Sequence, residues 1–420
     1  MRRVIKFGGT SLATPELIRN AAEHVARLVQ YGEQIAVVCS APGNATSELL
    51  KAYDAASAGS TDFASVSEFA SLGEEQSVQL MCAALRSFDI STQPFLPRHS
   101  DRWPIIADVD ESIPLSKAKA NEERAITLRT QHTVGRFRRF ILPQLRVGSV
   151  PVISGFFVQS SSGKVLAMGR GGSDVTAFIV ATHISADEVV IVTDVQGVLS
   201  ADPRLAENPR LLEELTLSDL EVISSAGTQV IHPRALKYRN PGLRARLIDY
   251  RELDRLDSSG TSVLGASETT LYRNPDELSM LTLVGDLTDR VGLLSALVQW
   301  MDENHLSPAA ASTSRRFICY YLPSGIADKA YSSLHGKLTK EFPELTNISL
   351  RGNVGELRLR SSRFIDEPGV LAEVTGVLAN ARINVLEVIT GLTDISIFIA
   401  YGDMDKAEKL LGRVLEHFSG

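Results

Sequence analysis

The stretch Val165-Leu-Ala-Met-Gly-Arg-Gly-Gly-Ser-Asp174, near the middle of a 420-residue chain, determines how the rest of the sequence is interpreted. A strand that ends in glycines lets backbone N–H groups approach an anion, and a following helix adds the positive end of its dipole. Arg170 can bind a carboxylate or phosphate with two hydrogen bonds, and Asp174 in the first helical turn can orient a lysine or a metal. For one such loop alone, an ordinary glycine turn with a helix cap is the simpler alternative.

A second glycine loop, at the N-terminus, favours the anion-binding interpretation. The segment Arg2-Arg-Val-Ile-Lys-Phe-Gly-Gly-Thr-Ser11 contains a short apolar strand, Lys6, two glycines and two hydroxyl residues. We expect Thr14 to cap a helix with Pro15 at its first position, followed by a buried strand over residues 35–39. This βαβ unit has neither the Walker A spacing nor the dinucleotide fingerprint. Its lysine precedes the glycines and would reach back over phosphates bound on the loop.

Composition indicates a globular chain with several domains. Hydrophobic residues make up 44% of the chain and charged residues 22%, and this length predicts roughly two to four domains. The net charge of −7 provides no basic surface, so we expect neither nucleic acid nor a membrane as a partner. Three cysteines without metal-ligand spacing, no signal peptide and no long apolar run predict a cytoplasmic protein. The sequence offers no metal-ligand cluster.

Two further loops are expected at the carboxyl edge of the sheet, where open α/β sheets bind ligands. Residues 39–46 follow the strand over 35–39. Residues 193–204 follow a strand over 189–192, and their two acids and one arginine suit a ribose, a metal ion or a nucleotide phosphate. A plain surface turn is the alternative. A helix over residues 65–85 carries Glu74, which alone would be interpreted as a solvated charge.

The remaining pattern of the first 265 residues predicts a three-layer α/β domain with a largely parallel sheet. A strand over residues 150–154 leads into a hairpin over 156–167, and the last strand is expected over 245–249. Helices are expected over 173–183 and 217–225. The basic cluster Arg136, Arg138 and Arg139 is interpreted as a solvated helix face.

The C-terminal part repeats one pattern, β-α-β-β-α, which indicates internal duplication. We assign the two copies to residues 266–348 and 349–420. The second copy ends without its last strand, and residues 269–272, which precede the first copy, could supply it.

Five motifs together resemble those of aspartate kinases, members of the amino acid kinase family, in order and spacing. They are Lys6-Phe-Gly-Gly-Thr-Ser11, Gly169-Arg-Gly-Gly-Ser-Asp174, Thr193-Asp194, Asp202-Pro-Arg204 and Ile231-His-Pro233. The resemblance covers essentially the whole chain. It implies a three-layer α/β/α amino acid kinase domain followed by two βαββαβ ACT domains. It also implies ATP- and Mg²⁺-dependent phosphorylation of the β-carboxylate of L-aspartate, which is the first step toward lysine, threonine and methionine.

The resemblance also implies roles for individual residues. Lys6 would neutralise charge on the transferred phosphoryl group, and Asp174 would hold the lysine network or magnesium in place. An ionised carboxylate needs no general base to accept the phosphoryl group. Aspartate would be bound by Thr46, Glu74, Arg170 and Ser173. The nucleotide would be bound by Gly8, Gly9, Ser11, Thr193, Asp194, Asp202 and Arg204. His232 is interpreted as a packing residue.

Four positions depart from the family pattern. Leu199 replaces a tyrosine and Gln229 a lysine near the nucleotide, so we expect weaker nucleotide binding or a changed base preference. Ala309 and Arg315 stand where lysine-inhibited members have acids, so we expect weak or absent lysine inhibition. ACT pairs imply a homodimer or a larger homo-oligomer, with an amino-acid effector as a possible ligand.

Two alternative functions remain open from the sequence. One is a related amino acid kinase that acts on another carboxylate, such as that of glutamate or of an acetylated amino acid. The other is a non-catalytic ACT-containing sensor of amino acids. The presence of Lys6, Arg170 and Asp174 favours catalysis over the sensor.

Overall fold

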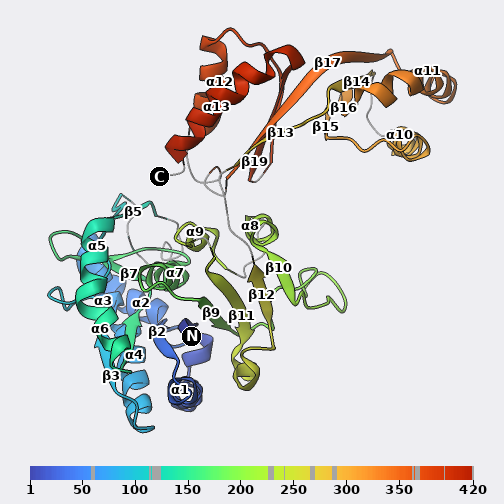
Figure 1. The fold of residues 1–420 in the computed structure, drawn as a ribbon. Helices are drawn as coiled ribbons and strands as arrows, with labels where there is room; N and C mark the ends of the chain where they lie inside the picture. Colours follow the sequence, from blue (N-terminus) through green and yellow to red (C-terminus); the bar gives the residue numbers. More distant parts are fainter. Residues whose placement is uncertain are drawn as a thin grey trace. The chain divides into compact units, whose positions relative to one another are not determined.

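The computed structural model describes residues 1–57, 62–112, 115, 124–225, 231–240, 242–264, 270–285, 291–361, 364, 369–391 and 393–418. The chain forms two compact units, residues 1–267 and 268–420, whose elements are labelled in Figure 1. Gln229 lies outside the described residues.

A largely parallel sheet forms the centre of the first unit. Within the described residues it has eight strands in the order β10-β12-β11-β9-β1-β2-β6-β3. These strands are β1 (Arg2–Phe7), β2 (Gln34–Cys39), β3 (Thr92–Phe95), β6 (Val150–Ser154), β9 (Glu188–Thr193), β10 (Glu214–Thr216), β11 (Arg244–Asp249) and β12 (Thr261–Leu264). Neighbouring strands are parallel except β11 and β12, which pair antiparallel. Two short hairpin sheets lie outside it: β4 (Ala107–Val109) with β5 (Ile126–Leu128), and β7 (Phe157–Gln159) with β8 (Val165–Ala167).

Helices cover both faces of this sheet. They are α1 (Pro15–Gln30), α2 (Ala45–Ser57), α3 (Phe63–Ala70), α4 (Leu72–Arg86), α5 (Thr130–Arg136), α6 (Leu142–Arg146), α7 (Gly172–His183), α8 (Leu217–Ser225) and α9 (Pro233–Leu236), with a π-helix, η2 (Phe137–Ile141), between α5 and α6. Alternate strand residues enter separate cores: Val4 packs in the cluster with α3 and α7, and Ile5 in the cluster with α1 and α4. This arrangement confirms the predicted three-layer α/β/α fold.

The local signals at the N-terminus act as predicted. The Thr14 hydroxyl accepts a hydrogen bond from the Leu17 amide, and Pro15 is the first residue of α1. The predicted hairpin before the central glycine loop is also confirmed, because β7 and β8 pair antiparallel.

Three predictions for the first unit were wrong. The helix expected over 65–85 is two helices, α3 and α4, because Ser71 Oγ donates to the Glu68 carbonyl where α3 ends. The strand over 245–249 is not the last, because the chain folds back through Gly260 to form β12. A Cβ at Gly260 would lie only 1.9 Å from the Leu247 carbonyl oxygen, so this turn requires glycine. Arg136 is only partly solvated, since its Nη1 donates to two backbone carbonyls.

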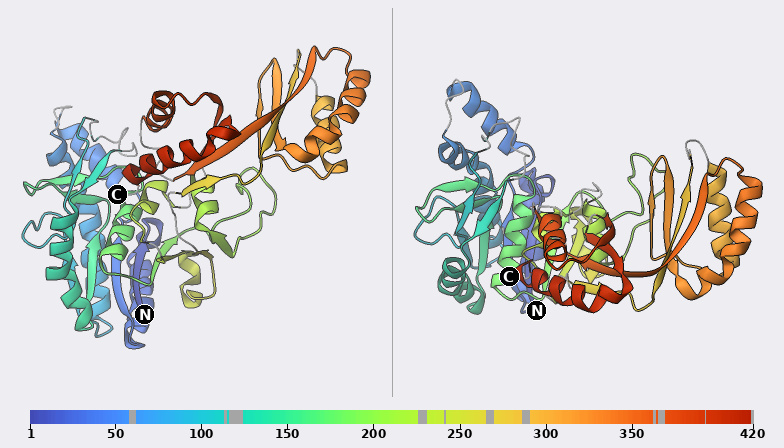
Figure 2. Two further views of the ribbon diagram at one scale, coloured as in Figure 1. Left: turned by 45° about the horizontal axis from the view of Figure 1, so that its top comes forward. Right: turned by 90° about the horizontal axis from the view of Figure 1, so that it is seen from above.

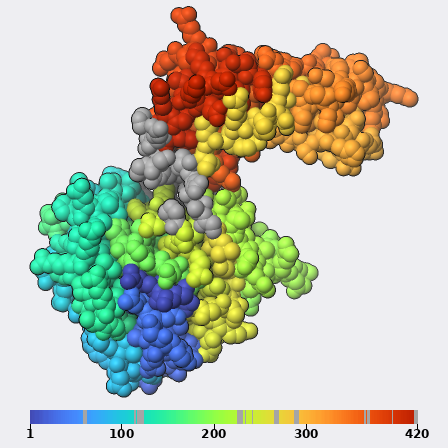
Figure 3. Space-filling view, viewed as in Figure 1, coloured from blue at the N-terminus to red at the C-terminus, as the bar shows by residue number. Residues whose placement is uncertain are grey.

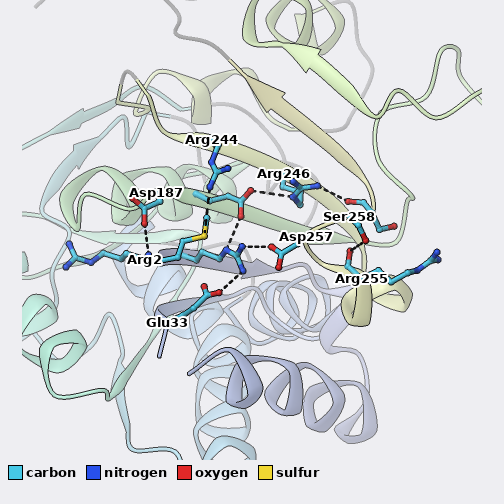
Figure 4. Close-up of polar contacts among 12 residues, drawn as sticks. Arg2, Glu33, Asp187, Arg244, Arg246, Arg255, Asp257 and Ser258 are labelled. Carbon is cyan, nitrogen blue, oxygen red and sulfur yellow. Dashed lines mark hydrogen bonds and ion pairs between the residues drawn. The ribbon is translucent and has the colours of Figure 1, made fainter. Parts of the chain in front are cut away.

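Ion pairs join the amino ends of the central strands, at the edge opposite the glycine loops (Figure 4). Buried Arg3 in β1 pairs with Glu33 at 3.3 Å, with Glu188 in β9 at 3.0 Å, and with Asp257. Arg246 in β11 also approaches Glu188, at 3.4 Å. In the space-filling view, the blue start of the chain, the green middle and the yellow β11–β12 region share one face of this unit (Figure 3). The network therefore ties together segments that are distant in sequence.

The second unit is a duplicated α/β structure built on one sheet. Within the described residues the strand order is β15-β16-β14-β17-β19-β18, with β13 paired to β17. Its strands are β13 (Thr270–Arg273), β14 (Leu278–Val284), β15 (Ala310–Thr313), β16 (Phe317–Pro323), β17 (Asn347–Arg360), β18 (Val385–Thr390) and β19 (Asp394–Ala400). Its helices are α10 (Val291–Glu303), α11 (Ser324–Glu341), α12 (Val370–Asn380) and α13 (Met404–Phe418).

The two copies share strand β17. Its first part pairs with β14, and its second part pairs with β13 and β19. Figure 2 shows β17 as a continuous ribbon running from the copy with α10 and α11 to the copy with α12 and α13. The division predicted at residues 348 and 349 lies within this strand. The prediction that the segment before the first copy completes the second copy is confirmed by β13.

Candidate active site

An ion pair between Lys6 and Asp174 joins the two glycine loops. Lys6 lies near the end of β1, and Asp174 lies in the first turn of α7. The Lys6 Nζ atom is 2.8 Å from Asp174 Oδ1, and the two side chains are only 12% and 15% exposed. A Cβ built on Gly8 would lie 3.8 Å from the same Nζ, so the ammonium group lies directly over the N-terminal glycine loop. The structure therefore brings together the two residues predicted as catalytic.

Backbone contacts fix the N-terminal glycine loop at the carboxyl edge of the sheet. The Gly8 amide donates to the Val192 carbonyl at 3.0 Å, and Ser11 Oγ reaches the same carbonyl at 3.4 Å. The Gly43 amide donates to the Gly9 carbonyl at 2.9 Å. A Cβ at Gly9 would lie 2.8 Å from the Ala41 carbonyl oxygen, so no other residue fits without displacing the loop after β2. The loop is thus held between the ends of β2 and β9.

The central glycine loop is stabilised from α9. Gly171 has a φ of 72°, and a Cβ there would lie 2.3 Å from Cγ of His232, which therefore packs on the loop as predicted. Arg234, 8% exposed, donates to the carbonyls of Met168 at 3.2 Å and Arg170 at 3.4 Å. Sequence reasoning missed Arg234, because the contact spans more than 60 residues and its only local signal is a cation after His232 and a proline.

A buried carboxyl group lies in the predicted aspartate pocket. Glu74, in the first turn of α4, is only 3% exposed, and Thr46 Oγ1 donates to its Oε1 at 3.5 Å. Burial raises the pKa of Glu74 to about 8, and this effect outweighs its hydrogen bonds. Its second oxygen, Oε2, has no hydrogen-bond partner among the described residues. Such a carboxyl group is suited to receive a ligand cation.

The other two predicted aspartate-binding residues belong to the central loop. Ser173 Oγ lies beside Gly155, which follows β6. Arg170 is exposed, and no partner for its guanidinium group occurs in the described part of the chain. Its charge is therefore available to a ligand.

The residues predicted to bind the nucleotide beyond the N-terminal glycine loop form two separate pairs. Thr193 Oγ1 donates to Asp194 Oδ1 at 3.2 Å. Arg204, whose side chain is 86% exposed, donates through Nε and Nη2 to Asp202 at 3.0 and 2.7 Å. This pairing lowers the pKa of Asp202 to about 2. Neither residue has a described contact with the glycine loops, so the structure does not bring them into the Lys6–Asp174 cluster. Half-buried Leu199 forms a backbone bridge with Leu211 nearby.

Comparison with known protein families identifies the fold. The sequence model of the amino acid kinase family matches residues 1–249, which is more than half of the chain. This chain belongs to the amino acid kinase family. A second model, of the ACT domain, matches residues 351–413 in the duplicated unit. The predicted combination of an amino acid kinase domain with ACT domains is therefore confirmed.

Proteins named as aspartokinases align with this amino acid kinase over nearly its full length. Aspartokinase 2 of Bacillus subtilis is 27% identical over 439 aligned positions, which cover 98% of this chain and 97% of the relative. The aspartokinase of Corynebacterium efficiens is 28% identical over 426 positions, covering 97% and 94%.

Two solved structures have the same fold. Aspartate kinase from Synechocystis aligns with a TM-score of 0.70 at 23% identity, covering 98% of this chain and 69% of that chain. E. coli aspartokinase III in complex with aspartate and ADP aligns with a TM-score of 0.54 at 21% identity, covering 99% and 100%. In the described part of this amino acid kinase, no helix is long and apolar enough to cross a membrane.

Proposed function

We propose that this amino acid kinase is an aspartate kinase, which transfers the γ-phosphoryl group of ATP to the β-carboxylate of L-aspartate. The products are 4-phospho-L-aspartate and ADP. The observation that carries the proposal is the Lys6–Asp174 ion pair over two glycine loops, in a unit that also holds the buried Glu74 carboxyl group. The names of the full-length relatives support the choice of aspartate as substrate.

The phosphoryl group is transferred by positioning and charge neutralisation. An oxygen of the β-carboxylate attacks the γ-phosphorus, the bond to the bridging oxygen breaks, and its electron pair leaves with ADP. The carboxylate is already ionised at neutral pH, so no side chain has to remove a proton. Lys6 neutralises negative charge on the transferred group, and Asp174 keeps the ammonium group in place. The backbone at Gly8, Gly9 and Ser11 receives the phosphates.

Aspartate is held through the groups that do not react. Glu74 receives the α-ammonium group, and Arg170 binds the α-carboxylate with its unpaired guanidinium group. Thr46 and Ser173 supply hydroxyl hydrogen bonds. With both α-substituents fixed, only the β-carboxylate faces the phosphoryl group, and a substrate one methylene longer is misplaced.

The loop over residues 193–204, which follows β9, binds the nucleotide through Thr193, Asp194, Asp202 and Arg204. Magnesium accompanies ATP and supplies neutralisation of phosphate charge. No group of three potential metal ligands gathers in the described residues. Mg²⁺ often uses only one or two protein carboxylates, so a single side chain could hold it here. Asp174, whose Oδ1 is buried with Lys6 as its ion-pair partner, is the carboxylate suited to that role.

We further propose that the enzyme is cytoplasmic and forms a homodimer or larger homo-oligomer through its ACT domains, which can also take an amino-acid effector. The three buried free cysteines support a reducing compartment. The product feeds the synthesis of amino acids derived from aspartate.

ADP release with Mg²⁺ and ATP tests the function when L-aspartate, L-glutamate and N-acetylglutamate are compared. We expect turnover on aspartate alone. Lys6→Ala should lower kcat by at least about 100-fold, whereas Lys51→Ala, which removes an exposed lysine in α2, should have no effect. Turnover on another carboxylate would identify a related kinase. Aspartate binding without any turnover would identify a sensor.

A further inference from the structure

The loop proposed to bind the nucleotide begins between two strand ends at the carboxyl edge of the first sheet. Thr193, the last residue of β9, is paired with Asp249, the last residue of the neighbouring strand β11 (Figure 1). On the other side of β9, Val192 is paired with Phe7, which directly precedes the N-terminal glycine loop. The end of β11 is therefore separated from that glycine loop by a single strand.

A buried carboxylate at the end of β11 holds Arg251 in place. The side chain of Asp249 is only 2% exposed, and Arg251 donates three hydrogen bonds to it, from its amide at 2.8 Å, from Nε at 2.8 Å and from Nη2 at 2.6 Å. The guanidinium group also lies over the ring of Tyr250, with Cζ 5.3 Å from the ring centre. Ion pairs between two exposed side chains impose little order, whereas a forked contact with a buried carboxylate fixes the direction of the guanidinium group.

The fixed guanidinium group reaches the nucleotide loop. Arg251 Nη2 donates to the carbonyl of Asp194 at 3.0 Å, across 57 positions of the chain. Four residues after Asp194, the Val198 amide donates at 2.8 Å to Oγ1 of Thr261, a fully buried residue at the start of β12. The first part of the nucleotide loop is thus held at two points, and Arg251 provides the one that lies next to the glycine loop's neighbouring strand, β9.

We propose that Arg251 is a positioning residue for the nucleotide. Asp249 fixes its guanidinium group, which fixes the backbone at Asp194 and, with it, the side chains of Thr193 and Asp194. This inference rests on the nucleotide-binding role proposed above for the loop, and it assigns Arg251 no contact with ATP. Loss of Arg251 should weaken nucleotide binding, because a displaced loop presents its groups in the wrong place. The aspartate pocket should be unaffected, since the described contacts of Arg251 include none of its residues.

Calorimetric titration of the full chain with ADP and Mg²⁺, and separately with L-aspartate, tests the proposal without requiring turnover. Arg251→Met should raise Kd for ADP by about fivefold or more, the effect of losing roughly one hydrogen bond, and leave Kd for aspartate unchanged. Arg255→Met is the matched control. Arg255 lies in the same 3₁₀ helix, η3 (Tyr250–Arg255), pairs with Glu252, and has a side chain 67% exposed, against 62% for Arg251. It should change neither Kd.

Two further variants separate the positioning role from folding and from simple charge. Asp249→Asn keeps the size of the side chain and an acceptor for the Arg251 amide, but it loses the charge that holds the guanidinium group. It should also weaken ADP binding and spare aspartate, even if Arg251→Met disturbs folding. Arg251→Lys keeps the positive charge without the planar fork, so it should not restore ADP binding.

A nonhydrolysable ATP analogue distinguishes positioning from direct contact with the phosphates. A residue that acts through the loop weakens the analogue and ADP by the same factor, whereas a residue that touches the γ-phosphate weakens the analogue more. We expect the same factor for both nucleotides in Arg251→Met.

Several results would overturn the positioning role. These are unchanged ADP binding in both Arg251→Met and Asp249→Asn, an equal loss of aspartate and ADP binding, full restoration by Arg251→Lys, or a larger loss for the ATP analogue than for ADP. Failure of the wild type to bind ADP would refute the proposed nucleotide site as well. Normal ADP binding by the wild type and by both variants would refute the role of Arg251 alone.

Discussion

Binding of aspartate should expel a proton from Glu74. Burial raises the pKa of this carboxyl group to about 8, so at pH 7 about nine-tenths of the free enzyme carries it in the neutral form. The α-ammonium group of the substrate requires the ionised form. Each binding event should therefore release about 0.9 proton at pH 7 and about 0.5 at pH 8. The apparent affinity for aspartate should rise about tenfold between pH 6 and pH 7 and level off above pH 8.

Isothermal titration calorimetry measures this release directly. Titrations of aspartate at pH 7 in two buffers with different ionisation enthalpies give the number of protons from the difference in apparent heat. The neighbour Glu75 provides a matched control, because it is also buried but pairs with Arg98 at 3.0 Å. Glu75→Gln should keep the proton release. Glu74→Gln should abolish it and weaken aspartate binding.

The same pKa shift affects stability. The folded state holds the Glu74 proton more tightly than the unfolded state, so stability is lost as pH rises from 4.5 to about 8. At pH 7, which is 2.5 units above the ordinary value of 4.5, the loss amounts to about 3 kcal/mol. Glu74→Gln should recover up to about 3 kcal/mol of unfolding free energy at pH 7, and less than about 1 kcal/mol at pH 5. For the calorimetry, proton release near zero when aspartate binds the wild type, or unchanged release in Glu74→Gln, would refute the inference that Glu74 is neutral in the free enzyme and ionised in the complex.

Three other outcomes are expected. Arg234→Met should raise KM for aspartate about tenfold with a smaller change in kcat, because the central glycine loop loses the two hydrogen bonds that Arg234 donates to its carbonyls. An unchanged KM in steady-state kinetics would contradict the positioning role of Arg234. Arg3→Met should lower the unfolding free energy by about 3–5 kcal/mol, because Glu188 stays buried with fewer partners. KM should not change. A loss below about 1 kcal/mol in urea unfolding would show that the network is dispensable. Lysine, titrated with and without threonine, should inhibit weakly or not at all, because Ala309 and Arg315 offer no counter-charge. Half-inhibition below about 1 mM, in the range of ordinary metabolite affinities, would contradict this.

Much of the fold could be predicted, because its signals are local. Thr14, Pro15 and the buried strand over residues 35–39 specify the first βαβ unit, and the repeated C-terminal pattern specifies the duplicated unit. The prediction that residues before the first copy complete the second was also correct, because a missing strand leaves a definable gap in the sheet. The helices and strands themselves are determined by residues within them or next to them in sequence, whereas the pairing of β13 with β17 was inferred from the missing strand.

The predictions that failed depend on tertiary contacts. Helix spacing continues across Ser71, so the sequence did not reveal the break between α3 and α4. Arg136 looks like its solvated neighbours until the chain places Ser100 and Trp103 beside it. β12 pairs with β11 only because Gly260 allows the chain to turn back.

The site was predictable to a similar degree. The resemblance implied that Asp174 holds either the lysine network or magnesium, and the ion pair with Lys6 agrees with the first of these roles. The role of Glu74 in binding aspartate was implied only by the other family motifs. A single glutamate on a helix carries no sequence signal that it is buried. The contacts of Arg234 could not be read from the sequence, because they depend on how α9 packs against a loop more than 60 residues away.

Trapping of the product with hydroxylamine tests the central claim most directly. An acyl phosphate reacts with hydroxylamine to give a hydroxamate. The α- and β-hydroxamates of aspartate have the same mass, so fragmentation in tandem mass spectrometry, compared with both standards, shows which carboxylate was phosphorylated. We predict aspartate β-hydroxamate, formed in proportion to ADP, dependent on ATP and Mg²⁺, and absent with Lys6→Ala. ADP release without any hydroxamate, or formation of the α-hydroxamate, would contradict the assignment of this chain as an aspartate kinase.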